Sequence, residues 1–247
     1  MKYNPDDPKY RFTARKRQLL KRLLFRKGLS TTKRLLCSLA YLQAEGDSKY
    51  LAGVLDLFIK GKADFRKAYE VLLQGYLFCG YPRAIESFFC MNEILEEKNL
   101  DFLNNMVFRP LRESAYMIKR GESLSGKVHG GKAQNIRNKI DDICPDLGYL
   151  MIAEGYGHVL CRDGLDLKSR ELAVVASLTA LGTRRQLHSH IRGARNVGCR
   201  DLEILEVIVT GLAWIKPEKV RAAIELWSYV TGRESPDSID IIISSRV

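Results

Sequence analysis

Two residues of the sequence, Glu171 and His190, have side chains suited to acid–base chemistry and a spacing that brings them together. A helical periodicity of 100° per residue places each on an apolar helix face, Glu171 before the Leu181-Gly182 break and His190 after it. The apolar neighbours on the first face are Leu167, Val174, Val175 and Leu178, and those on the second are Leu187, Ile191, Ala194 and Val197. We therefore expect a carboxylate and an imidazole to meet where the two helices pack. Such a pair could serve catalysis, or it could only fix the helix register.

The residues around His190 divide by their angle on the helix. Thr183 and Gln186 lie two turns and one turn before His190 on the same side, so we expect both to line a shared pocket. Thr183-x-x-Gln186 also has the spacing of a capping box, which would begin the second helix. We expect His188, which lies off the apolar stripe, at the rim or on the surface. Arg185 lies on the polar side, from which it could reach an anionic ligand at the pocket mouth.

No pattern of metal ligands or paired redox thiols accompanies these residues. His129 and His158 have no partner at metal-ligand spacing, and the six cysteines include no C-x-x-C pair. The segment 121–132, GESLSGKVHGGK, is rich in glycine and serine and is predicted to be a loop. It contains neither GxxxxGK[ST] nor GxGxxG, so it does not indicate phosphate binding. The sequence predicts no metal and no cofactor.

The net charge of +11 is concentrated near the N-terminus. Residues 9–34 hold eleven Lys and Arg and no acidic residue, which leaves 29 basic against 29 acidic residues in the rest of the chain. This pattern is typical of a solvated basic helix packed through its leucines. An anionic partner, whether nucleic acid, an acidic protein or membrane headgroups, is the alternative. We favour the solvated helix, because no nucleic-acid motif accompanies the charge.

The rest of the chain is also predicted to be helical, which gives an all-α protein. Helices are expected at about 32–45, 48–60, 64–79 and 82–120, then at 145–156, 167–181, 183–198, 201–215 and 217–231. The turn Gly80-Tyr81-Pro82 should interrupt the chain between two of them.

An internal repeat organises these helices. A shift of 136 residues aligns Leu29–Gly75 with Leu165–Gly211 without a gap, and the identical pairs include Arg34/Arg170, Gly46/Gly182, Glu70/Glu206 and Gly75/Gly211. In the first copy Leu35 stands where Glu171 stands and Val54 where His190 stands. The same faces can therefore be filled by hydrophobic residues, so a costly buried Glu and His in one copy indicate a site.

We expect two tandem copies, with the first one degenerate. The predicted parts are a basic N-terminal helix (1–28), the first copy (29–112), the second copy with the site (113–232) and a C-terminal tail (233–247). The isoleucine run of the tail could dock on a neighbouring subunit. A fused pseudo-dimer is the expected architecture.

The second copy resembles a known family. From about Glu113 to Val230, the runs PDLGYL, GYGHVLCRDGLDLKSREL, HSHIRGARNVG and EILEVI are similar to the carboxymuconolactone decarboxylase family, part of the alkylhydroperoxidase D-like superfamily. The peroxidase branch carries Glu-x11-Cys-x2-Cys-x3-His. Glu171 and His190 stand at the outer positions of this pattern, while Thr183 and Gln186 replace the two cysteines. The first copy resembles the family more weakly and keeps the turn Phe78-x-Gly80-x-Pro82.

The resemblance implies a function and an assembly. Without the two thiols, we do not expect a thiol peroxidase, and the cysteine-free decarboxylase branch is the similar one. It implies an enzyme without a cofactor that acts on a small anionic lactone or carboxylate, with His190 as general acid/base and Glu171 holding its imidazole. Thr183, Gln186, Arg185, Arg162 and His188 would bind the substrate. Family members usually form trimers or hexamers, so this chain would form a trimer.

Two other classes of function remain open. One is a non-catalytic oligomeric protein that uses its basic N-terminus to bind an anionic partner. The other, least favoured, is a redox protein using isolated cysteines such as Cys199. No apolar run is long enough to cross a bilayer and the N-terminus lacks the apolar segment of a signal peptide, so we expect no membrane partner and a cytoplasmic protein.

Overall fold

The computed structural model describes residues 12–102, 112–236 and 239, and every regular element in this part of the chain is a helix. The all-α fold class is therefore confirmed. In chain order the first elements are α1 (Ala14–Leu24), α2 (Thr31–Glu45), α3 (Ser48–Lys60) and α4 (Phe65–Glu97). The middle elements are α5 (Ser114–His129), η3 (Gly130–Lys132), α6 (Ala133–Asp141), α7 (Pro145–Leu150) and the π-helix η4 (Met151–Leu160). The last are α8 (Leu167–Leu181), α9 (Arg184–Asn196), α10 (Asp201–Thr210), η5 (Gly211–Ala213) and α11 (Pro217–Thr231).

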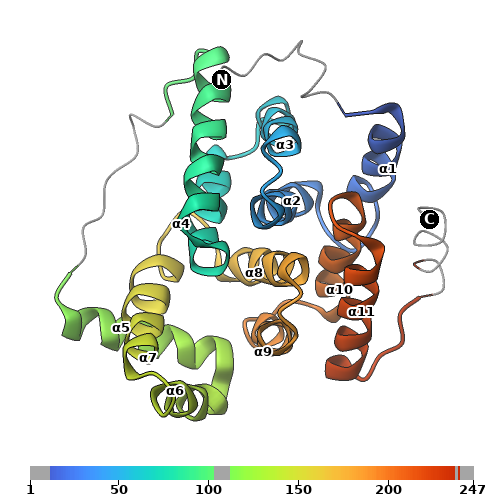
Figure 1. The fold of residues 1–247 in the computed structure, drawn as a ribbon. Coiled ribbons are helices and arrows are strands. Elements are labelled where there is room, and N and C mark those ends of the chain that lie inside the picture. The colour runs from blue at the N-terminus through green and yellow to red at the C-terminus, as the bar shows by residue number, and fades with distance from the viewer. Residues whose placement is uncertain (1–11, 103–111, 237–238, 240–247) are drawn as a thin grey trace.

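Helices α2 and α8 lie against each other at the centre of the molecule (Figure 1). Helices α3 and α4 pack on α2, whereas α9, α10 and α11 gather around α8. One large apolar core runs through all of these elements, and Leu39, Leu72, Val174 and Ile208 are among its fully buried members. A smaller cluster of Leu124, Val128, Ile152, Tyr156 and Leu160 joins α5 to η4.

Local chemistry explains where the central helices begin and end. The hydroxyl of Ser30 accepts a hydrogen bond from the Lys33 amide at the start of α2, and the carboxylate of Asp166 accepts one from the Ser169 amide at the start of α8. Both helices end at a left-handed glycine, Gly46 with φ 71° and Gly182 with φ 70°. The interruption predicted at residues 80–82 is present inside α4, where Gly80 has φ 81°.

Two sequence-based expectations about the middle of the chain are wrong. The predicted loop at 121–132 is mostly helix, because α5 continues to His129. The glycine at 121 is needed for close packing, as described below, and does not indicate a turn. The helix expected over 82–120 is also interrupted, since α4 ends at Glu97 and α5 begins at Ser114. Residues 1–11, and most of the tail expected to dock on a neighbour, lie outside the described residues. Within the described part, no helix is both long and apolar enough to cross a membrane.

Candidate active site

Glu171 and His190 meet in the interface between α8 and α9, as their positions on the two apolar faces predict. The Nδ1 atom of His190 lies 2.9 Å from Oε2 of Glu171, and both residues are almost fully buried. The helices can approach this closely because residue 193 is glycine, where a Cβ atom would lie 2.9 Å from the same carboxylate oxygen. The contact holds the imidazole in one orientation and leaves Nε2 as its second functional nitrogen.

Two further rings enclose the imidazole of His190. Phe78, next to the break in α4, meets it edge-on, with ring centroids 6.0 Å apart at 89°. His129, at the end of α5, lies on another side at 5.7 Å and 70°. His129 is itself held in place, because its Nε2 lies 2.6 Å from the hydroxyl of Tyr156 on η4. The site therefore contains a chain of polar rings from Tyr156 through His129 to His190.

Burial keeps Tyr156 and His129 uncharged at neutral pH. Burial and the neighbouring His190 together lower the pKa of His129 from 6.5 to about 4, whereas Glu171 acts in the opposite direction. Burial also raises the pKa of the Tyr156 hydroxyl, and the Glu171 carboxylate adds to this effect. At neutral pH the Tyr156–His129 hydrogen bond therefore joins two neutral groups. Glu171 is the formal charge that faces this cluster.

A cavity of about 540 Å³ opens beside His190. Most of its lining is apolar and comes from α4, α7, η4 and α8, with Leu77, Leu150, Met151 and Leu178 as examples. The polar groups that line it are Tyr76, Tyr81, Glu154, Tyr156, Thr183, Gln186 and His190. The hydroxyl of Tyr76 donates a hydrogen bond of 2.7 Å to the carboxylate of Glu154. Burial raises the pKa of Tyr76, and this hydrogen bond raises it as well. No lysine or arginine among the described residues lines this cavity.

The predicted substrate-binding residues have different positions. Thr183 and Gln186 line the cavity together with His190. Arg185 is exposed and outside the lining, and His188 lies outside it against Tyr229, with ring centroids 6.1 Å apart. The predicted capping box is wrong, because Thr183 precedes α9 without making a side-chain capping bond.

Arg162 is the clearest departure from the expected site. Its guanidinium is buried and forms a salt bridge with Glu70, with Nη2 and Oε1 3.1 Å apart. Arg170 approaches the other oxygen of the same carboxylate at 2.9 Å. Arg162 therefore compensates a buried charge and does not line the cavity beside His190. Glu70 is 92 residues away in sequence, so helical spacing around Arg162 gives no sign of this partner.

Sequence reasoning missed His129, Tyr156, Phe78 and Glu154. The sequence gives two reasons not to place His129 in the site: it has no partner at metal-ligand spacing, and its segment has the composition of a loop. Among the described residues there is no group of three His, Cys, Asp or Glu that could hold a metal ion. The available signal was local: His129 ends a helix whose apolar residues Met117, Leu124 and Val128 recur at helical spacing. That pattern favours a helix despite the glycines.

Comparison with known proteins agrees with the region that carries this site. The sequence model of the carboxymuconolactone decarboxylase family matches residues 145–228, which run from α7 into α11. The chain is also similar to Peroxisomal protein 2 of Saccharomyces cerevisiae, with 29% identity over 106 residues, or 42% of this chain. The match spans only 37% of the length of that relative. Residues 145–228, which include Glu171 and His190, are therefore similar to the carboxymuconolactone decarboxylase family.

Proposed function

We propose that this protein is an acid–base enzyme of the carboxymuconolactone decarboxylase type, working without a cofactor in the cavity beside His190. The observation that carries the proposal is the buried Glu171–His190 pair at a cavity that can hold a small molecule. Fixing an imidazole with a carboxylate, and pointing its other nitrogen at a substrate, is a common arrangement for a general acid/base.

In the proposed reaction, His190 handles one proton. When the substrate loses carbon dioxide, the electron pair of the breaking carbon–carbon bond moves into an adjacent carbonyl and forms an enolate. The imidazolium of His190 then gives its proton to the enolate carbon, and Glu171 stabilises the imidazolium until that transfer. Thr183 and Gln186 can donate hydrogen bonds to the carbonyl oxygen where the negative charge develops.

We propose a small lactone or carboxylate with a substantial apolar part as the substrate class. The anionic group was expected to meet Arg185 or Arg162, but neither lines the cavity. This arrangement suits decarboxylation, because a carboxylate in an apolar site loses charge density as carbon dioxide leaves. A cationic partner would instead stabilise the ground state.

The test compares carbon dioxide release from a panel of small lactone carboxylates and keto acids by the wild type and two variants. We expect His190→Ala to lose about 10²–10⁴-fold in kcat/KM, and Glu171→Gln to lose less, because it keeps a hydrogen-bonding group. His188→Ala is the matched control, since it removes a nearby imidazole outside the cavity. A folded His190→Ala protein with full activity would show that the assignment is wrong.

We also propose that the chain consists of two copies of one helical unit, related as a pseudo-dimer. Corresponding residues make corresponding contacts: Arg34 and Arg26 pair with Glu206, and Arg170 and Arg162 pair with Glu70. All three residues of the first set lie 136 positions from their equivalents in the second. On this alignment α1 is the counterpart of η4, so the basic N-terminal segment is the first helix of a unit.

Assembly and compartment belong to the same proposal. Four exposed apolar residues at the cavity mouth, Tyr81, Leu147, Leu150 and Leu181, support a homo-oligomer that covers this mouth. Light scattering on the purified chain would measure its mass, with a trimer as our expectation.

Six free cysteines support a reducing compartment, for which we propose the cytoplasm. The name of the yeast relative suggests the peroxisome as the alternative, and imaging of the tagged full chain beside a peroxisomal marker distinguishes the two.

A further inference from the structure

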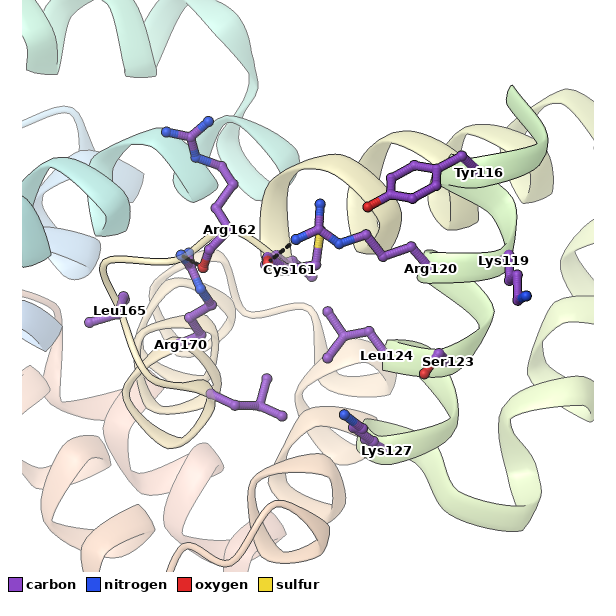
Figure 2. Close-up of a pocket in the computed structure, with 12 residues that line it drawn as sticks. Tyr116, Lys119, Arg120, Ser123, Leu124, Lys127, Cys161, Arg162, Leu165 and Arg170 are labelled. Carbon is purple, nitrogen blue, oxygen red and sulfur yellow. Dashed lines mark hydrogen bonds between the residues drawn. The ribbon is translucent and has the colours of Figure 1, made fainter. Parts of the chain in front are cut away.

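A second cleft, of about 510 Å³, lies between α5 and the chain that leads into α8 (Figure 2). One wall is α5, and the opposite wall is the segment from Leu160 to Arg170. Leu160 lines both this cleft and the His190 cavity, so the two hollows are neighbours. None of the residues assigned above to acid–base chemistry lines the second cleft.

The charges around this cleft are of one sign. Lys119, Arg120 and Lys127 of α5 line it, and Arg162 and Arg170 form its inner end. Glu70 compensates the last two, but no acidic side chain among the described residues lines the cleft. A hollow lined by cations and walled by apolar protein focuses a positive potential, which raises the local concentration of anions.

The cationic groups of α5 are available to a ligand. The guanidinium of Arg120 points across the cleft and donates one hydrogen bond, 2.8 Å long, to the carbonyl of Cys161 (Figure 2). This bond fixes its orientation and leaves other N–H groups free for an anion. Lys127 extends from the next turns of α5 toward the same hollow, and Lys119 lies at its outer rim. Both lysines are exposed and have no ion-pair partner among the described residues.

The floor of the cleft is apolar. Leu124 enters it from α5, and Leu160, Leu165 and Leu167 line it from the opposite wall. Leu124, Leu160 and Leu165 are at most 9% exposed, and Leu167 is partly exposed. A simple inorganic ion would leave the apolar surface that remains uncovered, whereas a molecule with an apolar body would bury it. The rigid wall that carries the cations comes from α5, which precedes the family-matched residues 145–228.

We propose that this cleft binds a small amphipathic anion, a carboxylate or phosphate on an apolar body, with Arg120 and Lys127 holding the anionic group. Lys119 adds to the field at the entrance, and the leucines hold the apolar part. The site is distinct from the acid–base cavity and does not depend on the function proposed for it.

Calorimetric titration of the full chain with decanoate, decyl phosphate and decanol tests the proposal. We expect decanoate or decyl phosphate to bind and neutral decanol to bind at least tenfold more weakly. The variant Lys119→Gln/Arg120→Gln/Lys127→Gln should weaken binding of the anion by at least tenfold. The matched control is Lys21→Gln/Arg22→Gln/Lys27→Gln, which changes exposed residues of α1 and the segment just after it. It removes the same number of positive charges and should change the affinity less than twofold.

Two further variants keep the result decisive. Lys119→Glu/Lys127→Glu changes only exposed residues, so it tests the charge even if loss of Arg120 disturbs the fold. Gln186→Trp fills the His190 cavity and should leave decanoate affinity unchanged. Equal binding of decanol, equal loss in the α1 control, displacement by inorganic phosphate at the same concentration, or loss of binding in Gln186→Trp would each overturn the proposal.

Discussion

The imidazoles of His129 and His190 lie ring to ring in a buried site, where a charge on one disfavours a charge on the other. Glu171 contacts His190 directly. His129, with its pKa near 4, remains a neutral wall of the site. In the function proposed above, His190 would transfer its proton beside a neighbour that does not compete for it.

The depressed pKa of His129 predicts a specific dependence of stability on pH. The unfolded chain takes up a proton at this residue near pH 6.5, whereas the folded protein does so only near pH 4. Stability from this residue is therefore complete above pH 6.5 and is lost as the pH falls toward 4, by about 2–3 kcal/mol in all. Urea unfolding of the wild type and His129→Gln at pH 7 and pH 4.5 measures the difference.

For each protein, the free energy of unfolding at pH 4.5 is subtracted from that at pH 7. The packing that His129→Gln loses is the same at both pH values and therefore cancels. We expect the wild type to lose more stability than His129→Gln over this interval. Carboxylates such as Asp166 contribute equally to both proteins. The pKa of Asp166 is lowered by its hydrogen bonds with Ser169. Identical losses in the two proteins would show that His129 titrates normally in the folded state.

Only part of this site could be predicted from residue types. The 3.6-residue period was enough to bring Glu171 and His190 together, because both lie on long, regular helices. His129 lies 61 residues before His190 on another helix, and no local period connects the two segments. Arg162 looked available because it is charged and near the site in sequence, but its partner Glu70 belongs to the other half of the chain.

At the scale of elements, the crossing of α5 and η4 depends on two glycines. A Cβ atom on Gly121 would lie 2.0 Å from the backbone oxygen of Ile152, and one on Gly157 would lie 2.2 Å from that of Met117. Backbone atoms cannot turn aside as side chains can, so neither position has room for alanine. Gly121, in the segment that was predicted to be a loop, is therefore a helical residue that allows a close crossing.

We predict that Gly121→Ala destabilises the protein by about 1–3 kcal/mol, through overpacking against η4. Gly126→Ala in the same helix is the control, since nothing lies within 4 Å of its Cβ position. It should stabilise the protein by up to about 1 kcal/mol, as replacement of glycine in a helix usually does. Thermal unfolding of both variants measures the expected loss of stability in Gly121→Ala and the expected gain in Gly126→Ala. If Gly121→Ala left the stability unchanged, the helices would have to cross less closely.

At the scale of the whole molecule, two buried ion-pair clusters join distant parts of the chain. Glu70 of α4 meets Arg162 and Arg170 beside α8, and Glu206 of α10 meets Arg26 and Arg34 beside α2. The sequence repeat indicated that Arg34/Arg170 and Glu70/Glu206 are equivalent positions. It could not show that each arginine binds the glutamate in the other half of the chain, because alignment gives equivalence and not contact.

Removal of the carboxylate from one cluster should be costly. Glu70→Ala leaves two buried guanidinium groups without a counter-charge, so we predict a loss of about 3–5 kcal/mol in the free energy of unfolding. Glu122→Ala removes an exposed carboxylate from α5 and should change stability by less than about 0.5 kcal/mol. Urea titration of each variant gives the values, and if the protein tolerates Glu70→Ala as well as Glu122→Ala, water must reach the arginines.

The two partners in the cluster at Glu206 are synthesised at different times. Arg34 emerges from the ribosome 172 residues before the carboxylate that it needs, a delay of roughly 10–30 s at ordinary elongation rates. Through this interval α2 has no α8 to cover its apolar face. The nascent N-terminal half therefore exposes the centre of the future core until translation has passed α10.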